Sequence, residues 1–309
     1  MPKDAIHHIR VMGDTDLVNL DKHDILRALD DSGVILCRGI DFSLESFESF
    51  SSLFCDDFHR VGTRAKLRKH NGDGFSTEVF RDNFSLLAHS EGTYRPWPPP
   101  PELCFFYCVT PPSEAGGETT LIDGLAFYNR LPKDLLARFM ESGVIYQSHW
   151  EPARWQAEFG IESTDELKQL LCQFPEVEFR LENDKLDIRY KTSAFKPTAL
   201  GEPAFANALL AHLPHVNHPN HQDDKVYSRP DNQVFFGDRE KITDHVINQL
   251  IDIHDDILLA HRWQTGDLLL IDNTRFMHGR QMTVAPCERV LISRFGSRGK
   301  GNSIDRYQQ

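Results

Sequence analysis

The chain has 309 residues, of which 40% are hydrophobic and 10% aromatic, enough for a sizeable core. Its 46 acidic and 34 basic residues give a formal net charge of −12, which argues against nucleic-acid or anionic-membrane partners because both require a cationic surface. No apolar run approaches the length of a membrane span, and Met1-Pro2-Lys3-Asp4 lacks the apolar core of a signal peptide, so we expect a cytoplasmic protein.

The first expected elements are a helix, a strand and a second helix. Residues 21–31 have the apolar spacing of a helix that Gly33 ends, and residues 34–37 form an apolar strand. Ser43 is of the type that caps a helix N-terminus. Residues 61–75 are basic and glycine-rich, which fits either a solvated loop or a mouth that attracts an anionic ligand.

The tripeptide His89-Ser90-Glu91 is the first candidate site. On a β-strand its two outer side chains would leave the same face, with Cα atoms roughly 7 Å apart, and could converge on one metal ion. Taken alone, such a tripeptide is more often a pair of solvated residues at a strand edge, and it is the accompanying motifs that favour a metal site. Residues 103–109, beyond a proline-rich crossing, are apolar on both faces and predict a central strand covered on both sides.

The middle of the chain has a different character. Residues 150–175 are polar and amphipathic, residues 177–190 predict a hairpin, and residues 204–213 predict a short helix. Residues 214–232 form a long polar loop, and loops of this length are commonly lids or disordered.

Four histidines recur every three residues at the start of this loop: His212, His215, His218 and His221. Pro214 and Pro219 prevent the regular helix that would align them. We therefore favour a polar lid loop over a second metal site.

The last third returns to strands after one helix. Periodic apolar residues predict a helix over roughly 240–260, and residues 267–272 and 289–295 predict strands. Strands at both ends with helices between them indicate a mainly β fold with α insertions, a jelly roll. We expect one domain over residues 1–309, with a lid or insertion at about 150–232.

A third metal donor is expected from His278, which follows the strand at 267–272. Two histidines and a carboxylate that leave coordination positions open are the ligand set of non-haem Fe(II) oxygenases. His89, Glu91 and His278 are the candidates for this set.

Four motifs in this order resemble the taurine dioxygenase (TauD/TfdA) family, and within it the branch that hydroxylates amino acids in secondary metabolism, the syringomycin-pathway-like members. They are His89-Ser90-Glu91, Gly116-Gly117-Glu118-Thr119-Thr120, Trp263-Gln264-Thr265-Gly266-Asp267 and His278-Gly279-Arg280 followed by Arg289. The resemblance implies a double-stranded β-helix of the clavaminate synthase-like or cupin type, flanked by helices.

The resemblance also implies cofactors and their ligands. His89, Glu91 and His278 would bind Fe(II), and 2-oxoglutarate would chelate the metal with its keto-acid end. Its far carboxylate would pair with Arg289, 11 residues past the distal histidine, and with Thr119. A planar guanidinium suits this task because it offers two parallel hydrogen bonds. Oxidation by O2 would then release succinate and CO2.

The reaction expected is hydroxylation or desaturation of a C–H bond, because Glu91 fills the position that a small residue takes in related halogenases. The substrate expected is small and polar, an amino acid or amino-acid-derived natural product, either free or tethered to a carrier protein. The alternatives are a non-oxidative metal-dependent enzyme and a non-catalytic binding module on the same fold. The oligomeric state is not predicted.

Substrate-binding residues are harder to place. The taurine enzyme holds its substrate with a second arginine, and Ser293 occupies that position here, so Arg294 lies one residue out of register. The further candidates are Arg64 in the basic loop (with its neighbour Arg68), Thr93 and Tyr94 beyond the metal tripeptide, and Asn207 in the lid region.

Overall fold

The computed structural model describes residues 7–10, 21–38, 43–59, 70–79, 83–222, 225–283 and 288–299. Arg64 and Arg68 lie outside these residues, as does most of the basic loop. Within them, no helix is both long and apolar enough to cross a membrane.

The larger of two facing sheets contains eight strands among the described residues, in the order β1-β2-β16-β7-β18-β5-β4, with β3 also paired to β18. Apart from the parallel pair β1 and β2, the strands pair antiparallel. Their bounds are β1 (His7–Arg10), β2 (Val34–Arg38), β3 (Cys55–Phe58), β4 (His70–Asn71), β5 (Ser76–Glu78), β7 (Leu103–Thr110), β16 (Leu268–Asp272) and β18 (Val290–Arg298).

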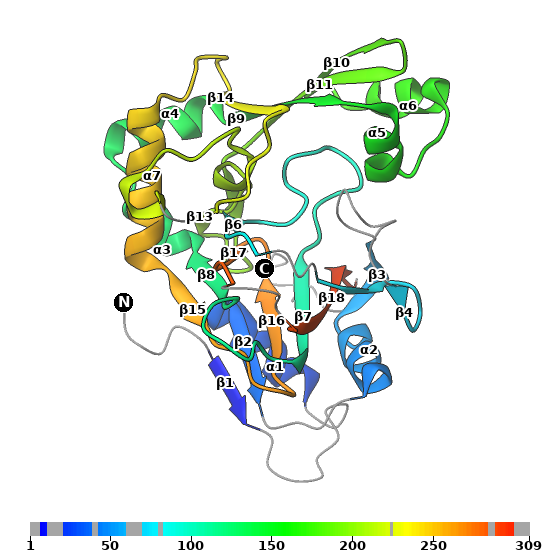
Figure 1. The fold of residues 1–309 in the computed structure, drawn as a ribbon, viewed down its shortest axis with the longest axis vertical. Helices are drawn as coiled ribbons and strands as arrows, with labels where there is room; N and C mark the ends of the chain where they lie inside the picture. Colours follow the sequence, from blue (N-terminus) through cyan, green and yellow to red (C-terminus); the bar gives the residue numbers. More distant parts are fainter. Residues whose placement is uncertain are drawn as a thin grey trace, which may run out of the picture.

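The smaller sheet runs in the order β15-β8-β17-β6. Its strands are β6 (Leu86–His89), β8 (Thr119–Asp123), β15 (Leu259–His261) and β17 (Phe276–Arg280). The two sheets form the jelly roll, which confirms the mainly β fold expected from the sequence (Figure 1).

Alternation along the strands explains why the central ones are apolar on both faces. In β7, Phe105 packs against α1 (Lys22–Ser32) and α2 (Leu44–Ser52), whereas Phe106 packs between the two sheets. In β16, Leu270 likewise packs on the side of the helices, and Leu269 packs between the two sheets. One face of the large sheet is thus covered by helices and the other by the second sheet.

The segment between β8 and β15 builds a separate layer. It contains the sheet β10-β11-β9-β14, the pair β12-β13 and five α-helices. The strands are β9 (Val144–Trp150), β10 (Val177–Glu182), β11 (Lys185–Thr192), β12 (Phe195–Pro197), β13 (Pro203–Phe205) and β14 (Asn232–Phe236). The helices are α3 (Gly124–Tyr128), α4 (Lys133–Ser142), α5 (Pro152–Phe159), α6 (Thr164–Leu171) and α7 (Asp244–Ile257), with the 3-10 turns η3 (Leu210–His212) and η4 (Pro219–His221). In Figure 1, α5, α6 and the β10–β11 hairpin lie at the opposite end of the molecule from α1.

The predicted helix over 204–213 is wrong. The segment begins in β13, and only its end forms a 3-10 turn. The Asn207 side chain explains the break, because its Oδ1 accepts from the Leu209 N–H at 2.9 Å and its Nδ2 donates to the Ala194 carbonyl at 2.9 Å. A side chain that bonds to nearby backbone competes with helix formation.

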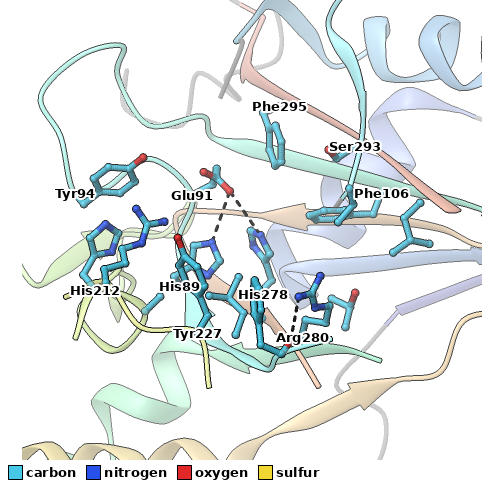
Figure 2. A pocket seen from close by; sticks show the side chains of 18 of the residues that line it. His89, Glu91, Tyr94, Phe106, His212, Tyr227, His278, Arg280, Ser293 and Phe295 are labelled. Atoms are coloured by element: carbon cyan, nitrogen blue, oxygen red, sulfur yellow. Dashed lines mark hydrogen bonds and ion pairs between the residues drawn. The ribbon is translucent and has the colours of Figure 1, made fainter. Parts of the chain in front are cut away.

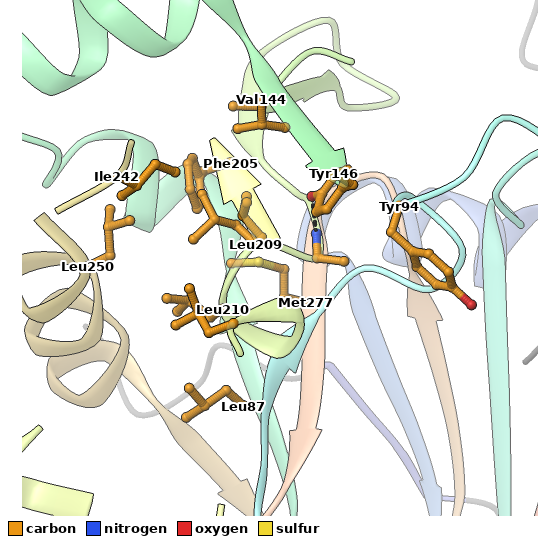
Figure 3. Close-up of a cluster of buried hydrophobic side chains, with 14 of the residues drawn as sticks. Leu87, Tyr94, Val144, Tyr146, Phe205, Leu209, Leu210, Ile242, Leu250 and Met277 are labelled. Carbon is orange, nitrogen blue, oxygen red and sulfur yellow. Dashed lines mark hydrogen bonds between the residues drawn. The ribbon is translucent and has the colours of Figure 1, made fainter. Parts of the chain in front are cut away.

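A buried cluster fastens this layer to the strands of the smaller sheet (Figure 3). Leu87 of β6 and Met277 of β17 pack with Leu209 and Leu210. Tyr146 of β9 adds a hydrogen bond, accepting at its hydroxyl from the Ala208 N–H at 3.0 Å. Strands β6 and β17 therefore have the inserted layer behind them and the space between the sheets in front.

The five cysteines in the described residues are free. Cys37, Cys55, Cys104 and Cys108 are buried, and burial raises the pKa of each thiol, to about 12 in Cys37, Cys55 and Cys108. Cys172, at the end of α6, is exposed.

Candidate metal and cosubstrate site

The strand register brings the two candidate histidines together. His278 in β17 is paired directly with His89 at the end of β6, and their ring centroids are 4.8 Å apart. Glu91 completes the group, with its Oε2 3.7 Å from His89 Nε2 and 4.0 Å from His278 Nε2 (Figure 2). The three ligand atoms all lie within 4.8 Å of one another.

Glu91 reaches this point from a turn. Strand β6 ends at His89, so the prediction of one strand through both residues is wrong. Gly92 adopts φ 74°, a left-handed conformation that glycine adopts without strain and that ends the extended chain. Convergence on one point is therefore produced by a turn that folds Glu91 back toward the sheet.

The histidines present the lone pairs that a metal ion requires. His89 Nδ1 lies 3.3 Å from the Leu87 carbonyl, and donation there leaves Nε2 as an acceptor facing Glu91. Burial lowers the pKa of His278 to about 3, with His89 lowering it further and Glu91 opposing, so this imidazole is neutral. Two imidazoles and one carboxylate fit an Fe(II) ion.

A cavity of about 210 Å³ extends from these three residues. Thr119 and Arg289, the residues expected at the far carboxylate of 2-oxoglutarate, both line it. Arg289 is 2% exposed and donates from Nη1 to the Gly117 carbonyl at 2.8 Å. The Thr119 hydroxyl accepts from the Trp263 indole N–H at 3.1 Å. The sequence motifs thus converge on one cavity, with a buried cation beside the three candidate metal ligands.

Among the residues proposed for substrate, Tyr94 lines the cavity, and Thr93, Asn207 and Arg294 do not. The Thr93 hydroxyl donates to the Ser90 carbonyl at 3.0 Å, within the turn. Asn207 is occupied by the backbone contacts described above. These two side chains hold the chain around the site.

Arg294 points away from the cavity, which removes it from the expected substrate site. Its Nη1 donates to both carboxylate oxygens of Asp73 at 2.7 and 2.8 Å and to Ser76 at 2.9 Å, and its guanidinium lies 4.0 Å above the Phe58 ring. Its neighbour Ser293 faces the cavity instead. The reason is strand alternation in β18, because a shift of one residue reverses the face.

Several cavity residues were not predicted from the sequence. They are Val79, Phe84, Leu86, Phe106, Arg154, Ala211, His212, Tyr227, Arg229, Gly279, Arg280, Leu291, Ser293 and Phe295. Those at positions 154, 211, 212, 227 and 229 come from the inserted layer, which therefore covers the mouth of the jelly roll. His212 was noticed only as part of the histidine run, and no motif marked Arg154 or Arg229.

Two further histidines of that run, His218 and His221, do not line the cavity and lie close to each other, with ring centroids 5.9 Å apart. His218 and His221 pack on α7, where they bond to Asp252 at 3.1 Å and Asp255 at 3.3 Å respectively. His218, His221 and Asp255 are close enough to hold a metal ion, but Asp255 also accepts from Asn220 and bonds to His254. These bonds account for the cluster as a link between the loop and α7.

A jelly roll that carries two histidines and a carboxylate beside a buried arginine has the architecture of the non-haem Fe(II) oxygenases. The family model described as "Taurine catabolism dioxygenase TauD, TfdA family" matches residues 10–294. The chain therefore belongs to the TauD/TfdA family, and it is an Fe(II)- and 2-oxoglutarate-dependent dioxygenase that uses O2.

The chain is also similar to curated relatives in sequence and to solved structures in fold. The dapdiamide synthesis protein DdaC of Enterobacter agglomerans is 24% identical over 84% of this chain and 81% of its own. A clavaminate synthase-like protein of Arabidopsis thaliana is 24% identical over 90% and 86%. A taurine dioxygenase of Burkholderia xenovorans superposes with a TM-score of 0.58 at 15% identity, covering 95% and 86% of the chains. AAD-2, solved with Mn(II) and N-oxalylglycine, gives 0.51 at 17% identity, covering 95% and 94%.

Proposed function

We propose that His89, Glu91 and His278 bind the iron, that Arg289 and Thr119 bind the far carboxylate of 2-oxoglutarate, and that the enzyme hydroxylates or desaturates a small polar substrate, an amino acid or a natural product derived from one. The observation that carries the proposal is the convergence of the three donor atoms within 4.8 Å at the wall of a cavity that Arg289 also lines. When bound, iron and 2-oxoglutarate supply the oxidation of a C–H bond by O2, with release of succinate and CO2.

The remaining parts of the site are supplied by the chain. The two imidazoles and Glu91 would hold the ion and would leave coordination positions for ligands from the cavity. Arg289 offers a permanent charge in a buried place, where it attracts a carboxylate more strongly than it would in water. Phe106 and Phe295 pack edge to face, with ring centroids 5.9 Å apart, and form an apolar wall that limits the access of water.

The substrate class rests on the size of the cavity and on its mixed lining. A cavity of about 210 Å³ suits a small molecule, and its walls combine aromatic rings with arginine and histidine side chains. Glu91 as the carboxylate ligand supports hydroxylation or desaturation, because a halogenase would need a small residue there.

Two measurements test the proposal. Anaerobic addition of Fe(II) and 2-oxoglutarate to the purified protein should give the charge-transfer absorption of a chelated keto acid, and E91A should lose it while the exposed-site control E166A keeps it. Succinate release is then measured across a panel of amino acids, and at least one should stimulate it. An E91A variant with normal absorption and turnover would refute the assignment of the ligands.

A further inference from the structure

Two arginines from the inserted layer face the cavity from the side of Tyr94. Arg154 belongs to α5, and Arg229 to the loop before β14. Four of their guanidinium nitrogens, Nε and Nη2 of Arg154 and Nε and Nη1 of Arg229, are buried without a hydrogen-bond partner. Buried donors in this state are costly and rare in folded proteins. Arg154 Nε lies 3.5 Å from Glu158 Oε1, so the N–H groups available to a ligand are those on Arg154 Nη2, Arg229 Nε and Arg229 Nη1.

The charges at this wall do not balance within the described residues. Glu158 is the buried carboxylate nearby, and it is shared by Arg95 at 3.4 Å, Arg154 at 3.5 Å and the Tyr94 hydroxyl at 3.1 Å. Arg229 has no carboxylate partner in the described part of the chain, and its guanidinium lies 5.5 Å from the centroid of the Tyr94 ring. Burial lowers the pKa of Arg154, Glu158 raises it and Arg229 lowers it again. A net positive charge remains at the cavity wall.

His212 adds an acceptor next to these cations. Its Nδ1 lies 3.2 Å from the Ala208 carbonyl, to which it donates, so Nε2 carries the lone pair. Nε2 is buried without a partner, and the ring is tilted by 32° against the Tyr94 ring, with the centroids 4.2 Å apart. Burial lowers the pKa of His212, so the ring is neutral and accepts an N–H or O–H from a ligand.

The position of this wall separates it from the place assigned to 2-oxoglutarate. Figure 2 shows Tyr94 and His212 on one side of the His89–Glu91–His278 group, and Phe106 and Arg280 on the other. Arg289 is bonded to Gly117, at the start of the chain segment that leads into β8. The cavity thus has cationic groups from two different parts of the fold.

We propose that Arg154 and Arg229 bind a free carboxylate of the substrate, with His212 accepting a hydrogen bond from an adjacent N–H or O–H group. The inference rests on the proposed function and narrows it to a free acid such as an α-amino acid. An ester, an amide or a carrier-bound thioester would lack the charge that these two arginines require. The wall replaces the substrate arginine that β18 lacks, since Ser293 stands at that position.

The direct test uses acetate as the probe and acetamide as its neutral counterpart of nearly the same shape. The melting temperature of protein loaded with Mn(II) and 2-oxoglutarate is measured with each, at equal ionic strength. We expect acetate to raise it saturably by about 2–4 °C over acetamide. The R154Q/R229Q variant should lose this difference, and R130Q should keep it, because Arg130 is exposed and does not line the cavity. An equal response to acetate and acetamide in the unmodified protein, or an undiminished difference in R154Q/R229Q, would overturn the proposal.

Turnover provides the second arm. Among compounds that stimulate succinate release, each free acid should exceed its carboxamide at least tenfold in kcat/KM, and R229Q should remove this preference while leaving the KM for 2-oxoglutarate unchanged. If R154Q/R229Q folds poorly, R229K and R229Q are compared, since only the first keeps the charge. If the unmodified protein showed no charge-transfer absorption with Fe(II) and 2-oxoglutarate, the proposed function itself would be rejected. Normal absorption with no preference for the acid rejects only the carboxylate site.

Discussion

Asn273 holds the backbone of Glu91 at both of its hydrogen-bonding groups. Its Oδ1 accepts from the Glu91 N–H at 2.8 Å, and its Nδ2 donates to the Glu91 carbonyl at 3.1 Å and to that of Pro101 at 2.8 Å. Asn273 follows directly after β16, so a central strand of the large sheet fixes the turn that carries the proposed metal carboxylate.

The substitution N273A should weaken metal binding without removing any ligand. Outer residues that orient a ligand typically contribute 10–100-fold in metal affinity, and we expect a loss of about that size. Titration with Mn(II), followed by electron paramagnetic resonance of the free ion, measures it. N129A, at an exposed position, serves as the control. An unchanged affinity of N273A for Mn(II) would show that the turn at Glu91 keeps its shape without Asn273.

The substitution R289K should raise the KM for 2-oxoglutarate by about 100-fold or more, because an ammonium group lacks the planar fork that pairs with a carboxylate. The turnover number at saturating 2-oxoglutarate should change far less. Initial rates of succinate formation over a range of 2-oxoglutarate concentrations separate the two parameters. A normal KM for 2-oxoglutarate in R289K would show that a cation other than Arg289 binds the far carboxylate of 2-oxoglutarate.

The substitution R294M should act on stability instead. Arg294 is fully buried, and its removal takes away the hydrogen bonds that it donates to Asp73 and Ser76. We expect a loss of about 2–3 kcal/mol in the free energy of unfolding, at the low end for a buried pair because Asp73 is partly exposed. Chemical denaturation measures this loss. The KM for 2-oxoglutarate should be unchanged, which contrasts with R289K.

Asp267 should make stability depend on pH in acid. Burial alone would raise its pKa, but hydrogen bonds from Arg38, His261 and the Gln264 N–H outweigh this and lower it to about 2. Because the folded pKa lies below the unfolded value of 3.8, the stabilisation is complete above about pH 4 and disappears as the pH falls toward 2.

We expect the contribution of Asp267 to amount to about 2 kcal/mol at neutral pH. Unfolding of the metal-free protein is measured between pH 2 and 6, and the difference between unmodified protein and D267N should shrink as the pH falls through this window. D165N, at an exposed carboxylate, should show no such change. If the difference in the free energy of unfolding stayed constant from pH 2 to 6, the effect of D267N would come from packing and not from the charge of Asp267.

Local patterns were sufficient for the regular elements of the jelly roll. The helix that Gly33 ends and the helix that Ser43 caps were both predicted, and the structure confirms them, because these signals act within one or two turns of the chain. The hairpin over 177–190 also has a local cause, since Asn183 and Asp184 adopt φ of 49° and 62° in its turn.

Where sequence reasoning failed, a distant contact or a change of direction was responsible. The turn at Glu91 depends on Asn273, far away in the sequence, and the broken helix after β13 depends on Asn207 bonding to Ala194. Arg154 and Arg229 are 75 positions apart in the sequence and meet only through the folding of the inserted layer. A single sequence gives no sign of such pairs, whereas motif order was enough to locate the proposed metal and cosubstrate residues.

Cys172 is exposed and the other described cysteines are buried, so the inserted layer can be labelled at one position. Since burial keeps the other described thiols protonated and out of reach, a maleimide dye at neutral pH should react with Cys172, once C287S has removed the cysteine outside the described residues. Such a label would sit at the end of α6, on the same layer as Arg154. A change in its fluorescence anisotropy on addition of Fe(II), 2-oxoglutarate or substrate would show that this layer moves when a ligand arrives.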